Sequence, residues 1–431
     1  MLVILPLLAH AYDNGAPNSR LPPLGWSSWV ALGPKAQHPI FDYCDETNVK
    51  HAIDAFHAVG LYDAGYRHFH LDDCWAGGRN ATGYLYPEAK HFPNGMAPVI
   101  AYAHKANLSF GLYTCAGNFT CVGHRPGSRD HWKQDAAVFA EWKVDVVKMD
   151  WCNTHGMHPK AAYGNMSAAL NSTGRAIHLN MCEWGIEDPW KWGGKIAQSW
   201  RMSHDHTGVW SSTKQQIRSS SAIPAPFTGS PFAWNDMDML ETGNYEQAAH
   251  ANGRESNMSA IEYRAEFSMW AISASPLVVT TPIMNCSEAA VDSEAVEWIA
   301  SPAGPSPKGG VVSCMPWISD LQREILLNKE VIAINQDVTP QGRPLKDGDL
   351  SVWGRVLSAK GTAAIALYNE DDTPRSIGVD FAMLDGLWGA TVGKVSVRDL
   401  WAKRSLGDYS KRLPPMEVAP HEAIMLKLTK L

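Results

Sequence analysis

Residues 144–152 read Val-Asp-Val-Val-Lys-Met-Asp-Trp-Cys, an apolar, β-branched run that ends in an acid. The run predicts a buried strand over Val144–Met149. Because side chains alternate along a strand, Lys148 and Asp150 share one face and Met149 takes the other. An acid at the end of a buried parallel strand is typical of the active-site mouth of an α/β barrel.

Seven further runs of this kind alternate with helical patterns along the first three quarters of the chain. They are Leu24–Trp29, Tyr66–Leu71, Leu108–Tyr113, Ala176–Met181, Ser199–Met202, Phe232–Trp234 and Pro276–Thr280. Helices are predicted from Asp45, as a cap, to Val59 and over Asp130–Lys143. This alternation indicates parallel βα units, and we predict an α/β fold, a (β/α)8 TIM barrel over residues 20–338.

The pattern changes after Gln341–Pro344, where short alternating runs take over. They are Leu350–Leu357, Thr362–Tyr368, Ser376–Phe381, Lys394–Asp399 and Ala423–Leu428. We predict a C-terminal antiparallel β-sandwich domain over residues 341–431. Within the barrel, a Pro/Gly/Ser-rich stretch at Ser301–Gly310 predicts an inserted surface loop near 286–314, with a disulfide joining Cys286 and Cys314.

Composition excludes several classes of protein. The 431 residues are 45% hydrophobic and only 19% charged, which supports a large buried core and excludes a disordered chain. A net charge of -7 argues against nucleic acid as a partner, since phosphate binding needs a basic surface. Trp (18) outnumbers both Tyr (13) and Phe (11), and flat indole faces commonly hold sugar rings.

The first eleven residues predict a signal peptide, because a short apolar run ends in Ala9-His10-Ala11. The positive n-region is missing, as in a truncated gene start, and no other apolar run predicts a membrane span. Seven N-x-[ST] sequons support secretion. The eight cysteines form no C-x-x-C motif, and their even number predicts disulfides whose pairing the spacing alone does not decide. The sequons are at Asn80, Asn107, Asn118, Asn165, Asn171, Asn257 and Asn285.

Four acid-bearing clusters follow predicted strands, and together they are harder to explain as helix caps than any one alone. They are His70–Trp75 with Asp72 and Asp73, Val147–Cys152 with Lys148 and Asp150, Ser199–Asp205, and Trp234–Met239 with Asp236 and Asp238. A lysine beside Asp150 is expected to lower the pKa of that acid and to keep it ionised, as a nucleophile must be.

Other chemistries lack their motifs. Asp72, Asp73, Asp236 and Asp238 could bind a hard cation, but no His-x-His or H-E-x-x-H supports a metal. A G-x-S-x-G elbow and the glycine-rich phosphate loops are also absent, so no cofactor is expected. Two carboxylates beside aromatic platforms point to glycoside hydrolysis.

Eight motifs in order resemble the α-galactosidases of glycoside hydrolase family 27. They are Leu24–Trp29, Asp72–Trp75, Gly111–Tyr113, Lys148–Cys152, Cys182–Gly185, Ser199–Arg201 with Asp205, Trp234–Leu240 and Val331–Asp337. The resemblance implies a retaining double displacement with Asp150 as nucleophile and Asp205 as acid/base. It places around the galactose Trp29, Asp72, Asp73, Tyr113, Lys148, Cys182, Trp184, Arg201 and Asp238, and it implies the disulfides Cys44–Cys74 and Cys121–Cys152.

Two residues in these motifs depart from the family pattern. Met237 stands where proline is usual, which should loosen the turn between Asp236 and Asp238. Cys115 stands where a small or acidic residue is commoner. For Asp205 to act as an acid, Arg201 is expected to contact the sugar or the other acid rather than Asp205.

The resemblance implies a secreted or lysosomal/vacuolar, exo-acting α-galactosidase whose partners are galactosylated oligosaccharides, glycolipids or polysaccharides, with a homodimer as one compatible state. Three alternatives stay open. An α-N-acetylgalactosaminidase is disfavoured because Trp184 should exclude an N-acetyl group. A β-L-arabinopyranosidase is disfavoured because Asp72 and Asp73 can bind a C6 hydroxyl that arabinose lacks. A sugar-binding protein without activity is disfavoured by the two intact acids.

Overall fold

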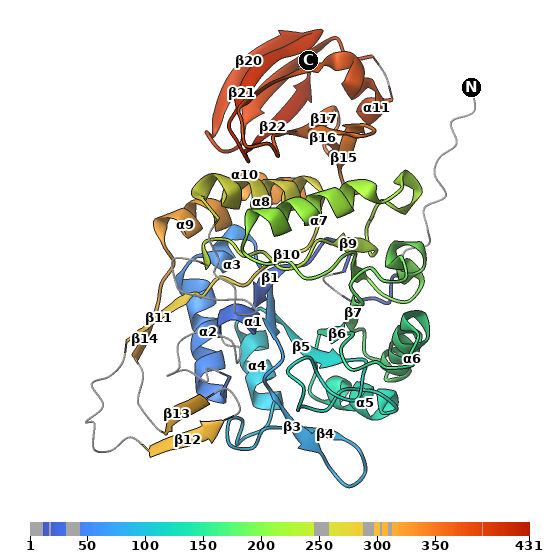
Figure 1. Cartoon of the computed structure of the whole chain (residues 1–431), viewed down its shortest axis with the longest axis vertical. Coiled ribbons are helices and arrows are strands. Elements are labelled where there is room, and N and C mark those ends of the chain that lie inside the picture. The colour runs from blue at the N-terminus through green and yellow to red at the C-terminus, as the bar shows by residue number, and fades with distance from the viewer. Residues whose placement is uncertain are drawn as a thin grey trace.

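The computed structural model describes residues 12–16, 19–31, 44–244, 258–287, 297–301, 304–308, 313–389 and 391–431. Eight parallel strands form one sheet in the order β10-β1-β2-β5-β6-β7-β8-β9 (Figure 1). They are β1 (Leu24–Ser27), β2 (His68–Leu71), β5 (Ser109–Cys115), β6 (Val146–Asp150), β7 (His178–Cys182), β8 (Ser199–Arg201), β9 (Trp234–Asp236) and β10 (Leu277–Val279). Leu240 closes the ring, because its N–H donates to Val278 O (2.9 Å) and its carbonyl accepts from Thr280 N (3.0 Å). The predicted barrel is confirmed.

Helices surround the barrel on its outer side (Figure 1). They are α1 (Ser28–Ala31), α2 (Glu46–Ala58), α3 (Leu61–Ala64), α4 (Ala97–Lys105), α5 (Trp132–Glu141), α6 (Pro159–Ser172), α7 (Trp210–Ala222), α8 (Ala260–Ile272), α9 (Asp320–Leu326) and α10 (Lys329–Asn335). Asp45 caps α2 as predicted, because its side chain accepts a hydrogen bond from Asn48 N (2.8 Å). The same helix buries Val49, Ile53 and Phe56 against the core.

One βα unit lacks a helix. Between β7 and β8 the chain forms two short 3-10 turns, Pro189–Lys191 and Gly193–Lys195. A Cβ on Gly193 would lie 2.7 Å from an atom of the Trp200 ring and 2.8 Å from the Met181 methyl carbon. Backbone therefore packs directly on the barrel at this point, which leaves no room for a helix with side chains.

The insertion after β10 is built from antiparallel ladders, so the prediction of a loop over Ser301–Gly310 is wrong in part. β11 (Met284–Ser287) pairs with β14 (Ser313–Pro316), and β12 (Glu297–Ser301) pairs with β13 (Gly304–Lys308). A two-stranded ribbon has two edges, which tolerate prolines such as those at 305 and 307. Cys286 lies opposite Cys314 in the register, but their side chains are outside the described part of the chain.

The C-terminal domain is antiparallel, as predicted, and holds two sheets. One has the order β15-β16-β17-β22-β19-β20 and the other pairs β18 with β21. The strands are β15 (Arg343–Lys346), β16 (Asp349–Val356), β17 (Thr362–Tyr368), β18 (Arg375–Asp380), β19 (Lys394–Asp399), β20 (Arg404–Ser410), β21 (Arg412–Val418) and β22 (Ala423–Lys430). The prediction missed β15, β20 and β21. After β18 come a 3-10 turn (Phe381–Leu384) and the short helix α11 (Asp385–Trp388). A separate hairpin, β3 (Ala76–Arg79) with β4 (Leu85–Pro87), follows β2.

The domain packs over α7, α8 and α10 of the barrel (Figure 1). Trp353, Tyr368 and Met425 belong to the same buried cluster as the barrel core. Trp401 Nε1 donates to Ser268 Oγ of α8 (2.9 Å). These aromatic side chains serve packing rather than an exposed sugar platform.

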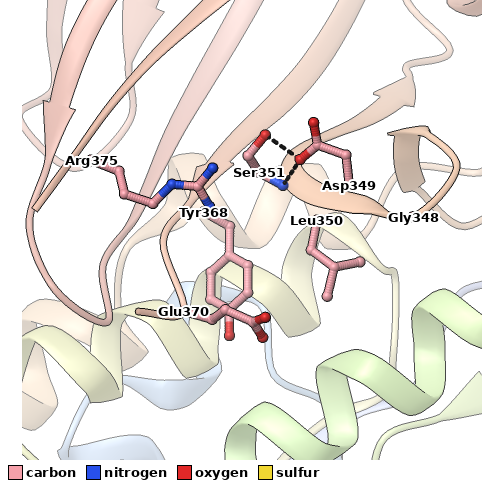
Figure 2. Close-up of a pocket in the computed structure, with 7 residues that line it drawn as sticks. All are labelled: Gly348, Asp349, Leu350, Ser351, Tyr368, Glu370 and Arg375. Carbon is pink, nitrogen blue, oxygen red and sulfur yellow. Dashed lines mark hydrogen bonds between the residues drawn. The ribbon is translucent and has the colours of Figure 1, made fainter. Parts of the chain in front are cut away.

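A polar hollow lies where this domain meets the barrel, lined by Gly348, Asp349, Leu350, Ser351, Tyr368, Glu370 and Arg375 (Figure 2). Within it, Asp349 Oδ1 accepts hydrogen bonds from the backbone and the hydroxyl of Ser351 (3.0 and 2.6 Å). Glu370 accepts two hydrogen bonds from Arg218 of α7 (3.0 and 3.1 Å). The rim of the hollow therefore ties the sheet domain to the barrel.

Candidate active site

The acid predicted as nucleophile ends β6 and is held by two hydrogen bonds. Asp150 Oδ2 accepts from Tyr113 Oη (3.1 Å), and Oδ1 accepts from Trp151 N (2.8 Å). In the parallel register, Cys115 of β5 and Cys182 of β7 lie opposite Asp150. The carboxylate is buried, with 9% of the residue exposed. Its orientation is therefore fixed before any substrate arrives.

Burial raises the pKa of Asp150 above its ordinary value; the Lys148 charge opposes the rise and the Asp205 charge adds to it. Lys148 therefore acts in the expected direction, but burial outweighs it and the pKa of Asp150 is raised rather than lowered. The ammonium of Lys148 instead hydrogen-bonds to Asp72 Oδ2 (2.9 Å), so its charge is mainly neutralised by another acid. Asp150 ends β6, and Arg201, which lies 3.2 Å from Asp205, ends the parallel strand β8, so the two acids lie at the same mouth of the barrel.

Asp72 and Asp73 follow β2 and have opposite electrostatic surroundings. Burial opposes ionisation of Asp72, but Lys148 and His70 outweigh it and lower its pKa. Burial and the neighbouring charge of Asp72 raise the pKa of Asp73 to about 7, although its Oδ2 accepts a hydrogen bond from Val122 N (3.2 Å). One acid is therefore a permanent acceptor, while the other can also donate a proton to a hydroxyl.

Arg201, the last residue of β8, connects three parts of the site. Its guanidinium lies 2.9 Å from Asp238 Oδ1 and 3.2 Å from Asp205 Oδ1, and Nη1 lies 3.5 Å from Cys182 Sγ. The expectation that Arg201 avoids Asp205 is therefore wrong, because Asp205 lies only four residues farther along a chain that turns back. Asp205 is the most solvent-accessible acid of the set, with 55% of its side chain exposed.

Asp238 orients the groups around Asp205. Its Oδ2 accepts a hydrogen bond from His206 N (2.7 Å), and its own N–H donates to Asp236 Oδ1 (2.9 Å). It adopts a φ of 81°, in the left-handed region, and Trp270 Nε1 fixes its carbonyl (2.8 Å). Such strain in a non-glycine residue persists only where its surroundings hold it.

The departure at Met237 has a structural reason. The Met237 N–H donates a hydrogen bond to Ser275 Oγ (2.9 Å), and the side chain is buried. A proline here would remove that donor. The turn before Asp238 is therefore held by this hydrogen bond in place of a proline ring.

Two disulfides support the site: Cys44–Cys74, and Cys121–Cys152 directly beyond the nucleophile. They are the pairs that the resemblance implies. The sulfurs of Cys121 and Cys152 and a carboxylate oxygen of Asp150 all lie within 4.8 Å of one another. Because both sulfurs are joined in a disulfide, they offer no thiolate for a metal. Cys115 and Cys182 are free and buried, and burial raises the pKa of both thiols.

Two tryptophans follow other strands of the barrel. Trp29 lies in α1 directly after β1, and Trp184 follows β7 with a φ of 60°. Both are half-buried, and Trp184 packs against the barrel core. The sequence interpretation missed Glu183, whose pKa burial raises to about 7, and the pair His206 and Gln216 beside Asp205. These contacts join loops to each other and to α7, so no local sequence pattern predicts them.

Comparisons with known proteins agree with this arrangement. The sequence model of the family described as alpha galactosidase A matches residues 21–295, and that of its C-terminal beta sandwich domain matches 347–428. The chain is 35% identical over 422 residues to an alpha-galactosidase of Cyamopsis tetragonoloba (97% of this chain, 88% of that one). It is 33% identical over 427 residues to a probable alpha-galactosidase of Dictyostelium discoideum (97% and 95%).

Among solved structures, alpha-galactosidase I of Mortierella vinacea superposes with a TM-score of 0.77 at 26% identity, covering 96% of this chain and 98% of that one. Family matches span both the barrel and the sandwich, and the acids, the arginine and the disulfides converge at one barrel mouth. The chain therefore belongs to the alpha galactosidase A family of glycoside hydrolases, family 27.

Proposed function

We propose that this protein is an exo-acting, retaining α-galactosidase that removes terminal α-D-galactosyl residues. The observation that carries the proposal is the placement of two unlike acids at one mouth. Asp150 is buried and held by two hydrogen bonds, whereas Asp205 is exposed and close enough for its charge to raise the pKa of Asp150. A fixed nucleophile and an accessible proton donor are what double displacement requires.

In the first step, an oxygen of Asp150 attacks the anomeric carbon of the galactoside. The bond from that carbon to the leaving oxygen breaks, and Asp205 transfers its proton to this oxygen. Each oxygen of Asp150 accepts one hydrogen bond, Oδ2 from Tyr113 Oη and Oδ1 from Trp151 N, so a second lone pair on either oxygen remains for the attack. The product of this step is a galactosyl ester on Asp150.

In the second step, water attacks the same anomeric carbon from the side that the leaving group has vacated. Asp205, now a carboxylate, accepts a proton from this water, and the ester bond to Asp150 breaks. Both residues return to their starting protonation, and galactose leaves with its anomeric configuration retained. Arg201 lies beside Asp205 and Asp238, where it compensates the charge that forms on Asp205.

Recognition of a chain end is supported by the depth of the acids after β2. Asp72 and Asp73 are 1% and 2% exposed, so a sugar that reaches them must present a free terminus. The ionised Asp72 accepts from hydroxyls and Asp73 can donate as well. We assign Trp29, Tyr113, Lys148, Cys182, Trp184 and Asp238 to the remaining wall of the galactose pocket.

The rival specificities have less support. Trp184 is held in a strained backbone conformation against the core, so it cannot easily move to admit an N-acetyl group. Asp72 and Asp73 would have one hydroxyl fewer to bind in an arabinoside, which lacks C6. A binding protein without activity would not need an acid pair coupled in this way.

We also propose that the chain enters the secretory pathway and acts outside the cell or in a lysosome or vacuole. Its disulfides require an oxidising compartment. The five sequon asparagines whose burial the structure describes are exposed: Asn80, Asn107, Asn118, Asn165 and Asn171. No described helix is long and apolar enough to cross a bilayer. Galactosylated oligosaccharides, glycolipids and polysaccharides are the proposed substrates, and light scattering would test a homodimer.

The test is turnover of melibiose and raffinose, with aryl α-galactoside, α-N-acetylgalactosaminide and β-L-arabinopyranoside compared by kcat/KM. NMR of the first-formed sugar reports its anomeric configuration. We expect the galactoside to be preferred and α-galactose to form first. Preference for another glycoside, or first-formed β-galactose, would contradict the proposal.

A further inference from the structure

The segment that carries Asp205 is irregular and depends on its neighbours for its position. After β8 ends at Arg201, the chain has no regular structure until α7 begins at Trp210. The residues on either side of Asp205 are fixed: Gln216 Nε2 of α7 donates to His204 O (2.7 Å), and His206 N donates to Asp238 Oδ2 (2.7 Å). The place of the acid is therefore set by residues 204 and 206.

The ring of His206 anchors the second of these points inside the protein. No part of its side chain is exposed. Nδ1 lies 3.0 Å from Met239 O and Nε2 lies 3.1 Å from Thr213 Oγ1. Because a carbonyl only accepts, Nδ1 carries a hydrogen. The ring also packs on Trp270, with centroids 5.1 Å apart.

Behind the ring lies a buried acid, Glu266 of α8, whose Oε1 is 3.7 Å from His206 Nε2. Glu241 N donates to Glu266 Oε1 (2.9 Å) and Thr242 Oγ1 donates to Oε2 (2.8 Å). Burial raises the pKa of Glu266 and of Glu241 to about 8 and lowers the pKa of His206. The charges that act on the histidine, Asp238 and Arg201, oppose each other. A neutral, hydrogen-bonded ring therefore stands at the base of the acid-bearing segment.

We propose that His206 is a positioning residue for Asp205: its ring, held by Met239 O and Thr213 and packed on Trp270, fixes the backbone that aims the Asp205 carboxyl at the leaving oxygen. This inference rests on the proposed function, since it assumes that Asp205 is the acid. Small displacements of a reacting group cost large factors in rate. A misplaced acid should lower the rate most for substrates whose leaving group needs a proton, and least for substrates whose leaving group departs readily without one.

The experiment compares His206→Phe with wild type on melibiose and on a 2,4-dinitrophenyl α-galactoside. Phenylalanine keeps the packing on Trp270 but removes both ring nitrogens. We expect kcat/KM on melibiose to fall by about 10²-fold and on the activated substrate by less than about tenfold. In His206→Asn the amide can replace the Nδ1 donor to Met239 O, and it should recover most of the melibiose activity although it loses the ring packing.

A matched control is His178→Phe, another buried histidine, at the start of β7 and bonded to Ser19 and Ser199 (2.9 and 2.8 Å). His178→Phe should change kcat/KM on both substrates by the same factor. Asp205→Ala separates the two hypotheses. If Asp205→Ala lowers kcat/KM more on melibiose than on the activated substrate, but His206→Phe lowers it equally on both, the positioning role is overturned. If Asp205→Ala also affects both equally, the acid assignment itself fails. Should His206→Phe not fold, as judged by its Tm, His206→Leu, which also lacks both ring nitrogens, carries the same comparison.

Discussion

Lys148 Nζ lies 2.9 Å from Asp72 Oδ2, in a pair whose side chains are 13% and 2% exposed. The cation of β6 thus compensates an acid that follows β2, across the intervening strand β5. Burial lowers and Asp72 raises the pKa of Lys148, with the net shift upward. The pair joins the wall that we assign to sugar hydroxyls to the strand that carries the nucleophile.

Removing this cation should destabilise the protein. In Lys148→Met, Asp72 remains buried without a counter-charge, and we expect the free energy of unfolding to fall by about 3 kcal/mol and KM to rise. The control is Lys191→Met, which breaks an ion pair to Asp188 with side chains 51% and 45% exposed and should change stability by less than about 1 kcal/mol. Denaturant unfolding measures both, and equal losses would contradict the role of burial.

The two disulfides form a matched experiment, because they close loops of nearly the same length, with sequence separations of 30 and 31. Loop-closure entropy predicts a similar loss, about 3.6 kcal/mol, when either pair is replaced by alanines. Only the Cys121→Ala, Cys152→Ala variant disturbs the backbone beside Asp150, so it alone should lower kcat by about tenfold or more. A kcat loss of equal size in Cys44→Ala, Cys74→Ala would refute this distinction.

Stability should be greatest at mildly acidic pH. Burial raises the pKa of Asp73 and Glu183 to about 7 and of Glu241 and Glu266 to about 8. Between pH 6.5 and 8 the unfolded chain therefore binds fewer protons than the folded one, and stability falls as pH rises. Below pH 6.5 the buried histidines oppose this trend, because burial lowers their pKa and the unfolded chain then binds protons that the folded chain does not; they are His68, His70, His178 and His206. We expect the Tm at pH 6.5 to exceed that at pH 8 by about 5 °C. The double variant Glu241→Gln, Glu266→Gln should show a weaker dependence of Tm on pH. An unchanged dependence would contradict the role of these buried acids.

The roles of the acids predict different responses to azide. Asp150→Ala should lose more than about 10³-fold in kcat on every substrate, because no other oxygen is placed for attack. Asp205→Ala should be most impaired on poor leaving groups, and azide should restore part of its turnover with a retained glycosyl azide. Any azide product from Asp150→Ala should be inverted, because azide then takes the place of the missing carboxylate in a single displacement. A retained product from Asp150→Ala, or an inverted one from Asp205→Ala, would contradict these roles.

Trp184 should set the choice at the 2-position. We expect at least about a tenfold preference for aryl α-galactosides over aryl α-N-acetylgalactosaminides, which corresponds to about 1.4 kcal/mol. Trp184→Ala should narrow that ratio, whereas Trp184→Phe should preserve most of it. Equal kcat/KM for the two glycosides in the wild type would exclude this role for the indole.

Sequence patterns predicted the eight barrel strands because each is a buried apolar run with a polar end. The strands Arg404–Ser410 and Arg412–Val418 were not predicted because most of their residues are exposed and the second carries a Pro-Pro pair at 414–415. At the site, spacing located the acids but not their partners. Whether Lys148 neutralises Asp150 or Asp72 depends on contacts across β5, and whether Arg201 reaches Asp205 depends on how a loop turns back. Neither is encoded in local periodicity.

The position of β22 affects when the C-terminal sheet can fold during synthesis. This strand is the last of the described elements to be synthesised, yet it lies in the middle of its sheet, between β17 and β19. Residues 423–430 must therefore be synthesised before the sheet can be completed, and until then β17 and β19 have no partner between them and the contact of β22 with α8 cannot form. A stop codon shortly before Ala423 would remove a central strand rather than an edge, and would leave a chain dependent on chaperones.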